Sequence, residues 1–178
     1  RKGQHTDKWI KTMENIEDSE ELSMIFRMHG CRIMDKAGKL LLKADLSGGF
    51  LSKKLDFYDA DGAPVAKVRQ IGLGKYRLDC GGQTMELHRR FTLTGEEYVM
   101  TGWVLHRNLL EHVYEMKKNG REISVVRKKW NPWEDDYMIT LRDSEDRIQA
   151  LVLAVLLDCG DNCFSCEGGQ KEPEKVEY

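Results

Sequence analysis

Residues 148–157 read IQALVLAVLL and decide how this chain folds, because they are almost entirely apolar and carry no charge. Polar and charged residues bracket them, with DSEDR at 143–147 and DCGDN at 158–162. As a helix the stretch is about 15 Å long, whereas a bilayer core is about 30 Å thick. A helix that is apolar on all sides and too short to cross a membrane is buried inside a protein. The sequence therefore predicts a buried helix at about residues 147–158.

The chain before this helix repeats a unit made of an alternating strand, a turn with Gly, and a second strand. Four copies cover 31–43, 55–68, 76–88 and 113–126, and a fifth at 137–148 runs into the helix. Tyr76 and Leu78 alternate with Arg77 and Asp79, which is typical of an antiparallel sheet with one buried face. Five hairpins give about ten strands, and 24–28 and 97–105 are predicted as additional strands. A sheet of this size around an apolar helix indicates a barrel.

The length of 178 residues fits one domain with a sizeable core, or two very small ones. Lys and Arg total 28 against 30 Asp and Glu, so we expect no nucleic-acid partner. We predict a barrel domain over 22–160, an extension over 1–21 and an acidic, disordered tail over 161–178. Trp9, Ile10, Met13 and Ile16 share one helical face, which predicts a short amphipathic helix in the extension.

The order of these pieces resembles that of a known family. A first strand MIFRM, successive D-x-x-G hairpins, the segment RKKWNPWEDDY at 127–137 and the following MITLRDSEDRIQALVLAVLLD are similar to the LURP-one-related proteins. These belong to the tubby C-terminal-like superfamily, which also includes the phospholipid scramblases. The resemblance covers roughly residues 22–160. It implies a closed antiparallel barrel of about 12 strands around a central C-terminal hydrophobic helix.

Catalytic motifs are not apparent in the sequence. It contains no G-x-S-x-G, no glycine-rich phosphate loop and no paired Ser/His or Cys/His order, and the family resemblance brings no catalytic signature. We therefore expect neither an enzyme nor a cofactor.

Three candidate ligand groups have simpler explanations. Cys159, Cys163 and Cys166 have the spacing of an iron–sulfur motif, and acylation is a second functional interpretation; we adopt the simpler one, reduced thiols at a helix end. His106 and His112 lack a third metal ligand nearby. The calcium-like sequence that begins at Asp59 is explained by a hairpin turn. We predict no metal site.

Basic residues are the candidate binding groups. Tubby proteins hold phosphoinositide headgroups with surface Lys and Arg, so the resemblance implies a headgroup site on the barrel exterior. The candidates here are Lys53, Lys54, Arg89, Arg90, Arg127, Lys128 and Lys129. Consecutive strand residues point to opposite faces, so a basic pair is not automatically one patch. Trp103, Trp130 and Trp133 are expected to pack in the core or in turns.

Two functional hypotheses remain from the sequence. The first is a non-enzymatic cytoplasmic binding module that contacts an anionic phospholipid or a membrane-associated protein, peripherally at the membrane. The alternative is a soluble interaction or scaffold domain without a lipid role. The first rests on superfamily analogy. The sequence does not determine the oligomeric state.

Overall fold

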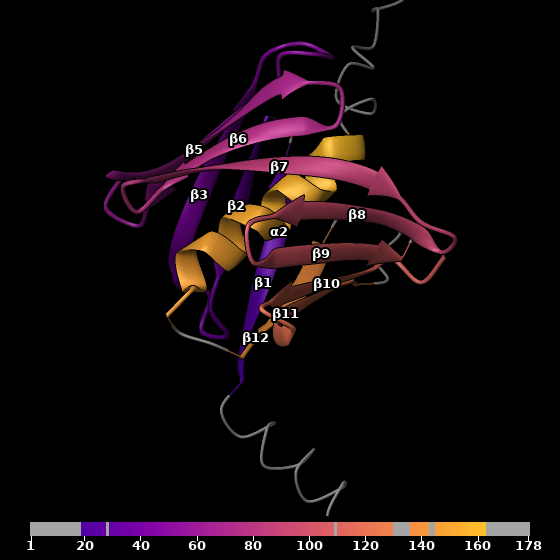
Figure 1. The fold of residues 1–178 in the computed structure, drawn as a ribbon. Helices are drawn as coiled ribbons and strands as arrows, with labels where there is room; N and C mark the ends of the chain where they lie inside the picture. Colours follow the sequence, from indigo (N-terminus) through magenta and orange to yellow (C-terminus); the bar gives the residue numbers. More distant parts are fainter. Residues whose placement is uncertain (1–18, 28, 109, 130–135, 143–144, 163–178) are drawn as a thin grey trace, which may run out of the picture.

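The computed structural model describes residues 19–27, 29–108, 110–129, 136–142 and 145–162. They form twelve strands and one helix (Figure 1). The elements are β1 (Glu20–Arg27), β2 (Gly30–Met34), β3 (Leu40–Ser47), β4 (Lys54–Asp59), β5 (Pro64–Gly72), β6 (Lys75–Cys80), β7 (Gln83–Phe91), β8 (Gly95–Met100), β9 (Trp103–Asn108), β10 (Val113–Lys118), β11 (Arg121–Lys128), β12 (Asp136–Leu141) and α2 (Arg147–Asn162).

The strands form a closed barrel in which each strand pairs antiparallel with its neighbours in sequence. The first and last strands close the ring, with Leu22 opposite Ile139 and Met24 opposite Tyr137. This confirms the predicted antiparallel barrel with a C-terminal helix.

The helix α2 runs along the inside of the barrel (Figure 1). Every side chain from Ala150 to Cys159 is buried, and Val152 is 0% exposed. The strands supply the matching apolar surface because every second side chain points inward, as Tyr76, Leu78 and Cys80 do on β6. The helix and the inner wall therefore form one hydrophobic core.

The barrel has two ends, which we name by the course of α2. At the proximal end, where α2 begins, Arg147 pairs with Glu20 at 2.7 Å. The turns β2–β3, β4–β5, β6–β7, β8–β9 and β10–β11 lie there, because neighbouring strands alternate in direction. At the distal end, where α2 ends, the Lys53 Nζ donates to the backbone oxygen of Cys159. The distal turns are β1–β2, β3–β4, β5–β6, β7–β8 and β9–β10.

Two local predictions need correction. Residues 97–105 form not one strand but parts of β8 and β9, with a turn at Thr101 and Gly102. The fifth repeated unit contains only β12, because its second half already belongs to α2. These two errors cancel, so the number of strands is still twelve. In addition, α2 extends to Asn162 rather than to 158. The predicted amphipathic helix at Trp9 lies outside the described residues.

Candidate functional site

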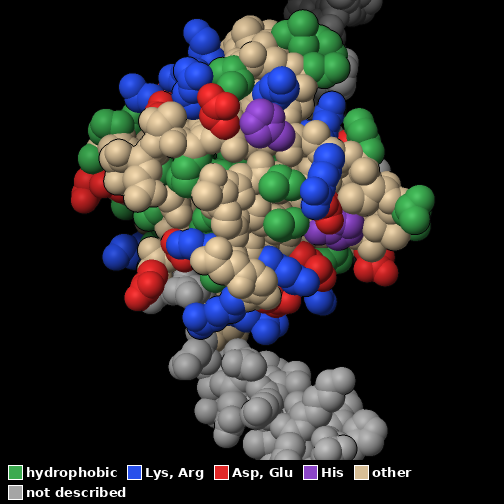
Figure 2. Space-filling model, viewed as in Figure 1, with side chains coloured by type: hydrophobic (Ala, Val, Ile, Leu, Met, Phe, Trp, Pro, Cys, Tyr) green, Lys and Arg blue, Asp and Glu red, His purple; other side chains and the backbone are tan. Residues whose placement is uncertain are grey.

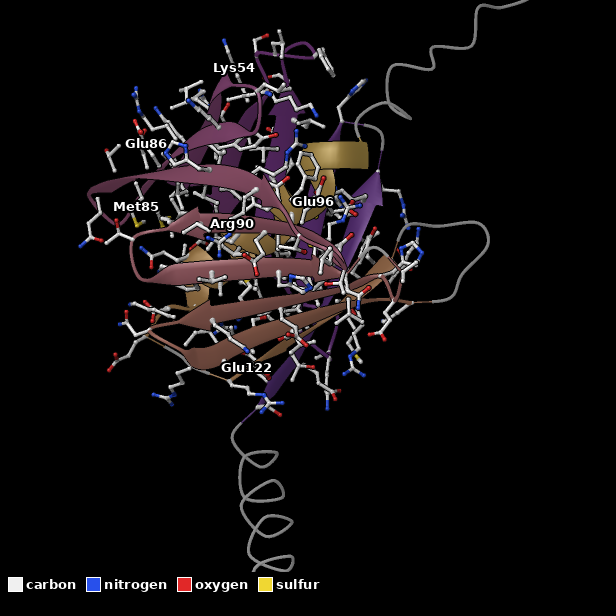
Figure 3. All side chains as sticks on the ribbon, turned by 45° about the vertical axis from the view of Figure 1, so that its right-hand side comes forward. Lys54, Met85, Glu86, Arg90, Glu96 and Glu122 are labelled. Carbon is white, nitrogen blue, oxygen red and sulfur yellow. The ribbon has the colours of Figure 1, made fainter. Side chains whose placement is uncertain are left out.

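The seven predicted basic residues all lie at the distal end of the barrel. Lys54 begins β4 and Lys53 precedes it, Arg89 and Arg90 are near the end of β7, and Arg127 and Lys128 end β11, with Lys129 directly after it. These strands are not neighbours in the ring, so the residues are spread around the rim. Figure 3 shows Lys54 and Arg90 well apart. The structure therefore brings the seven to one end without making them a single patch on the side.

The basic pairs also divide between the two faces of the wall. Arg89 has the same inward orientation as the buried Leu87, whereas Arg90 points outward and pairs with Glu97 at 2.6 Å. Lys128 likewise points inward, and its Nζ lies 5.9 Å from the centre of the Tyr137 ring. Each inward residue belongs to the mouth of the barrel.

A buried ion cluster lies inside the distal mouth. Glu96, whose side chain is 8% exposed, lies 3.6 Å from the Arg107 guanidinium and 3.9 Å from that of Arg89. Arg107 also lies over the ring of Tyr114, at 5.5 Å from its centre. Because a buried carboxylate is costly without a cation, the two arginines stabilise the charge of Glu96.

Asp158 joins the helix to the wall next to this cluster. Its Oδ1 accepts hydrogen bonds from the hydroxyls of Tyr114, at 3.2 Å, and Tyr137. Burial, followed by the charge of Asp158, raises the pKa of Tyr114 to about 12 and also raises the pKa of Tyr137. Both phenols therefore stay protonated and act as donors at neutral pH.

One inward cation, Lys53, stabilises the end of the helix. The last turn of α2 has no basic residue, although a helix C-terminus carries a partial negative charge. Lys53 donates to the Cys159 carbonyl at 3.4 Å. The barrel wall thus provides a cation that the helix sequence lacks, which gives Lys53 a structural role.

Side chains fill the described part of the mouth next to the helix end. The hollow between Lys53, Tyr76, Leu156 and Cys159 has no space for a water molecule. We therefore consider the outer rim as the candidate binding surface at this end.

Three exposed cations on the rim form neither an ion pair nor a side-chain hydrogen bond with a described residue. They are Lys54 on β4, Lys75 on β6 and Arg127 on β11. On the side of the barrel some cations are paired, since Arg69 lies 2.7 Å from Asp56 and Arg77 lies 3.2 Å from Glu86, whereas the exposed Arg32 and Lys67 form no ion pair with a described residue. The rim is distinguished by the position of its unpaired cations, which come from β4, β6 and β11 and lie at one end of the barrel.

The sequence profile of the LURP-one-related family matches residues 19–158. The chain belongs to the LURP-one-related family. An X-ray structure of a protein from Arabidopsis thaliana is similar, with a TM-score of 0.61 and 18% sequence identity over 79% of this chain and 90% of that chain. At this identity the likeness shows the fold alone. No curated protein matches the sequence.

The other candidates in this LURP-one-related protein lie apart from the distal cluster. His106 is on the outer wall, 3.7 Å from Glu97, and His112 is in the β9–β10 turn. Asp59 accepts hydrogen bonds from the backbone of Asp61 and Ala63, both at 2.9 Å, so it serves the hairpin turn. Among the described residues, no group of three His, Cys, Asp or Glu is placed to hold a metal.

The cysteines and tryptophans are only partly described. Cys31, Cys80 and Cys159 are buried free thiols, and burial raises the pKa of Cys31 and Cys80. Trp103 is 2% exposed in the core, as predicted. The other predicted residues of these two types, Cys163, Cys166, Trp130 and Trp133, lie outside the described residues.

Sequence reasoning missed several members of the distal site. Arg107 has the same parity on β9 as Trp103 and Leu105, so strict alternation would have placed it inside. Asp158 was assigned only to the polar boundary of the helix, and Lys75 was overlooked because it is an isolated cation. Their common location depends on the ring order of the strands, which no local pattern contains.

Proposed function

We propose that this protein binds anionic lipid headgroups at a membrane surface through the distal rim of the barrel. The observation that carries the proposal is the gathering of exposed, unpaired cations from three separate strands, β4, β6 and β11, at one end. Family membership supports a binding module in general. The proposal includes a cytoplasmic location, peripheral to the membrane.

The charge of the rim is local rather than global. The whole chain has a net charge of −2, so it has no general attraction to anionic surfaces. Lys54, Lys75 and Arg127 nevertheless project from the rim without described acidic partners. Each basic residue held near an anionic membrane contributes about 1 kcal/mol, and this contribution decreases with salt. We therefore expect salt-sensitive binding in one orientation.

Helix insertion plays no part in this mechanism. None of the described helices has both the length and the apolar character of a membrane span. The apolar face of α2 is already buried in the barrel, as Leu153 and Ala154 are 0% exposed. The contact is therefore made by the rim while the barrel stays folded.

The test is co-sedimentation with liposomes of neutral phosphatidylcholine, alone or mixed with phosphatidylserine or phosphoinositides. We expect binding to the anionic liposomes at low salt. The variant K54A/K75A/R127A should bind about 100-fold more weakly, since three contributions of about 1 kcal/mol are removed. The matched control is K39A/K67A/K117A, which removes the same charge from exposed positions away from the distal rim that likewise form no ion pair with a described residue.

The control variant should bind like the wild-type protein, because its substitutions lie away from the distal rim. No binding to any anionic liposome at low salt would exclude the proposal. Equal weakening of both triple variants would show that only net charge matters and would reject the assigned rim.

A further inference from the structure

Large hydrophobic side chains are exposed mainly at the distal end. Nine such residues are exposed among the described residues, and only two of them, Val104 and Ile148, lie elsewhere. The other seven occupy four distal turns or their margins: Phe50 and Leu51 at β3–β4, Ile71 and Leu73 at β5–β6, Phe91 and Leu93 at β7–β8, and Leu110 at β9–β10.

The fold itself does not require these apolar tips. Leu93 is 107% exposed and Leu110 is 86% exposed, so neither contributes to the core. Exposed turns normally contain Gly, Asn, Asp or Ser, which satisfy the backbone there. The proximal turns of this protein follow that rule, for example in 35–39 (DKAGK) and 119–120 (NG). The apolar distal tips therefore call for an explanation other than folding.

The four turns lie next to one another around the rim. They connect strands β3 to β10, which follow in unbroken order around the barrel, so the tips form an arc. Figure 2 shows hydrophobic side chains protruding at the top and right-hand edges of the view, where Figure 1 places turns of this end. An arc of separate tips fits a flat surface better than it fits a single peptide or helix.

Cations accompany the apolar tips in the sequence and in space. Lys53 and Lys54 follow Phe50 and Leu51, and Lys75 follows Leu73 after one residue. The Arg89 guanidinium lies 5.2 Å from the centre of the Phe91 ring. This combination matches a membrane interface, where cations meet headgroups and apolar groups enter the adjacent acyl region.

We infer that the distal tips, with Leu73, Phe91, Leu93 and Leu110 foremost, insert shallowly into the acyl boundary of an anionic bilayer. The inference rests on the proposed headgroup binding and adds a second, apolar component to it. Charge attraction brings the rim to the anionic bilayer surface, and the apolar side chains of the tips then move from water into the acyl boundary. Binding should accordingly keep a salt-resistant part, because apolar burial is not screened by salt.

The direct test uses Leu93→Trp and quenching by lipids brominated on their acyl chains, in mixed phosphatidylcholine and phosphatidylserine vesicles. We expect additional quenching relative to the wild-type protein, because the new indole reaches the acyl boundary. Val104→Trp is the matched control, since Val104 is 36% exposed on the outer wall near the proximal end. Its indole should remain unquenched.

The affinity test uses L73N/L93N/L110N, which leaves the rim charges unchanged. It should bind about tenfold more weakly at high salt, where the apolar component dominates. A wild-type level of salt-resistant binding in this variant would overturn the inference. Sedimentation velocity should show a monomer for the wild-type protein; self-association abolished by the same variant would show that the tips cover one another and would also overturn it.

The two proposals fail in distinguishable ways. If binding depends on anionic lipid but Leu93→Trp gives no additional quenching, headgroup recognition is supported and insertion is rejected. Quenching with equal strength in pure phosphatidylcholine supports insertion and rejects the headgroup preference. If the protein binds no vesicle at all, both proposals fall.

Discussion

The two ends of the barrel have the same architecture but different chemistry. At the proximal end, short turns rich in Asp, Asn and Gly meet the beginning of α2, and ion pairs such as Lys118 with Asp146 at 2.8 Å hold the helix. At the distal end, the turns carry exposed Leu and Phe together with basic residues, and a buried polar cluster surrounds the end of the helix. Chain reversal accounts for the Gly, Asp and Asn residues of the proximal turns, whereas it does not account for the exposed Leu and Phe of the distal turns.

Comparing the turns of the two ends shows which turn residues are needed for folding and which are not. Both ends have to reverse the chain between antiparallel strands, and the proximal turns show which residues suffice for that task. The distal turns contain exposed Leu and Phe side chains in addition to such residues, and folding does not require these side chains. This contrast is our reason for proposing the distal end as the binding surface.

The largest loss of stability is expected from a substitution in the middle of α2, in the core that both ends of the barrel share. Val152→Asp places a carboxylate at a side chain that is 0% exposed, without a cation, so it should cost more than about 4 kcal/mol and prevent soluble folding. Soluble yield and circular dichroism measure whether the variant folds. Ile148→Asp, at a position 39% exposed near the helix start, should fold normally. A well-folded Val152→Asp protein would refute the central placement of α2.

A smaller effect should distinguish the two ends of the helix. Asp158→Ala removes the acceptor of two buried tyrosine hydroxyls and should lower the free energy of unfolding by about 3 kcal/mol. Asp146→Ala removes a partly exposed ion pair at the other end and should cost about 1 kcal/mol. Urea unfolding compares the two variants directly. Equal losses would mean that the distal cluster is no more important than a surface pair.

The turns allow a further comparison of the two ends, with effects no larger than those expected at the ends of the helix. Gly48→Ala should cost about 3 kcal/mol, because φ is +88° and an added Cβ would lie 2.0 Å from the Ser52 backbone oxygen. Gly38→Ala, at a proximal turn with φ of +80° and open space around the Cβ, should cost about 1 kcal/mol. Thermal unfolding can rank them. The reverse ranking would show that the β3–β4 turn is not held in this conformation.

The overall architecture was predictable because its signals are local. The apolar run at 148–157 and the alternation in segments such as 76–80 predict a helix within a sheet without reference to distant residues. The turn at Thr101 and Gly102 was missed because Met100 and Trp103 around it are apolar, which hid the boundary between β8 and β9.

The site was less predictable because it depends on distant residues. The basic segments were recognised individually, but only the ring order shows that β4, β7 and β11 end at the same rim. The pairing of Glu96 with Arg89 and Arg107 joins three strands, and no local sequence pattern in any one of them indicates it. The exposure of Leu93 likewise depends on where its turn stands in three dimensions.

Closure of the ring has a consequence for how this protein meets other molecules. Because β1 pairs with β12 as well as with β2, none of the twelve described strands presents a free backbone edge. Among the described strands, a partner peptide therefore finds none to extend by β-addition, and a second copy finds none to join in a growing sheet. At the described part of the barrel, recognition falls to side chains and to the backbone of the turns, and for that reason substitutions of individual residues can identify its determinants.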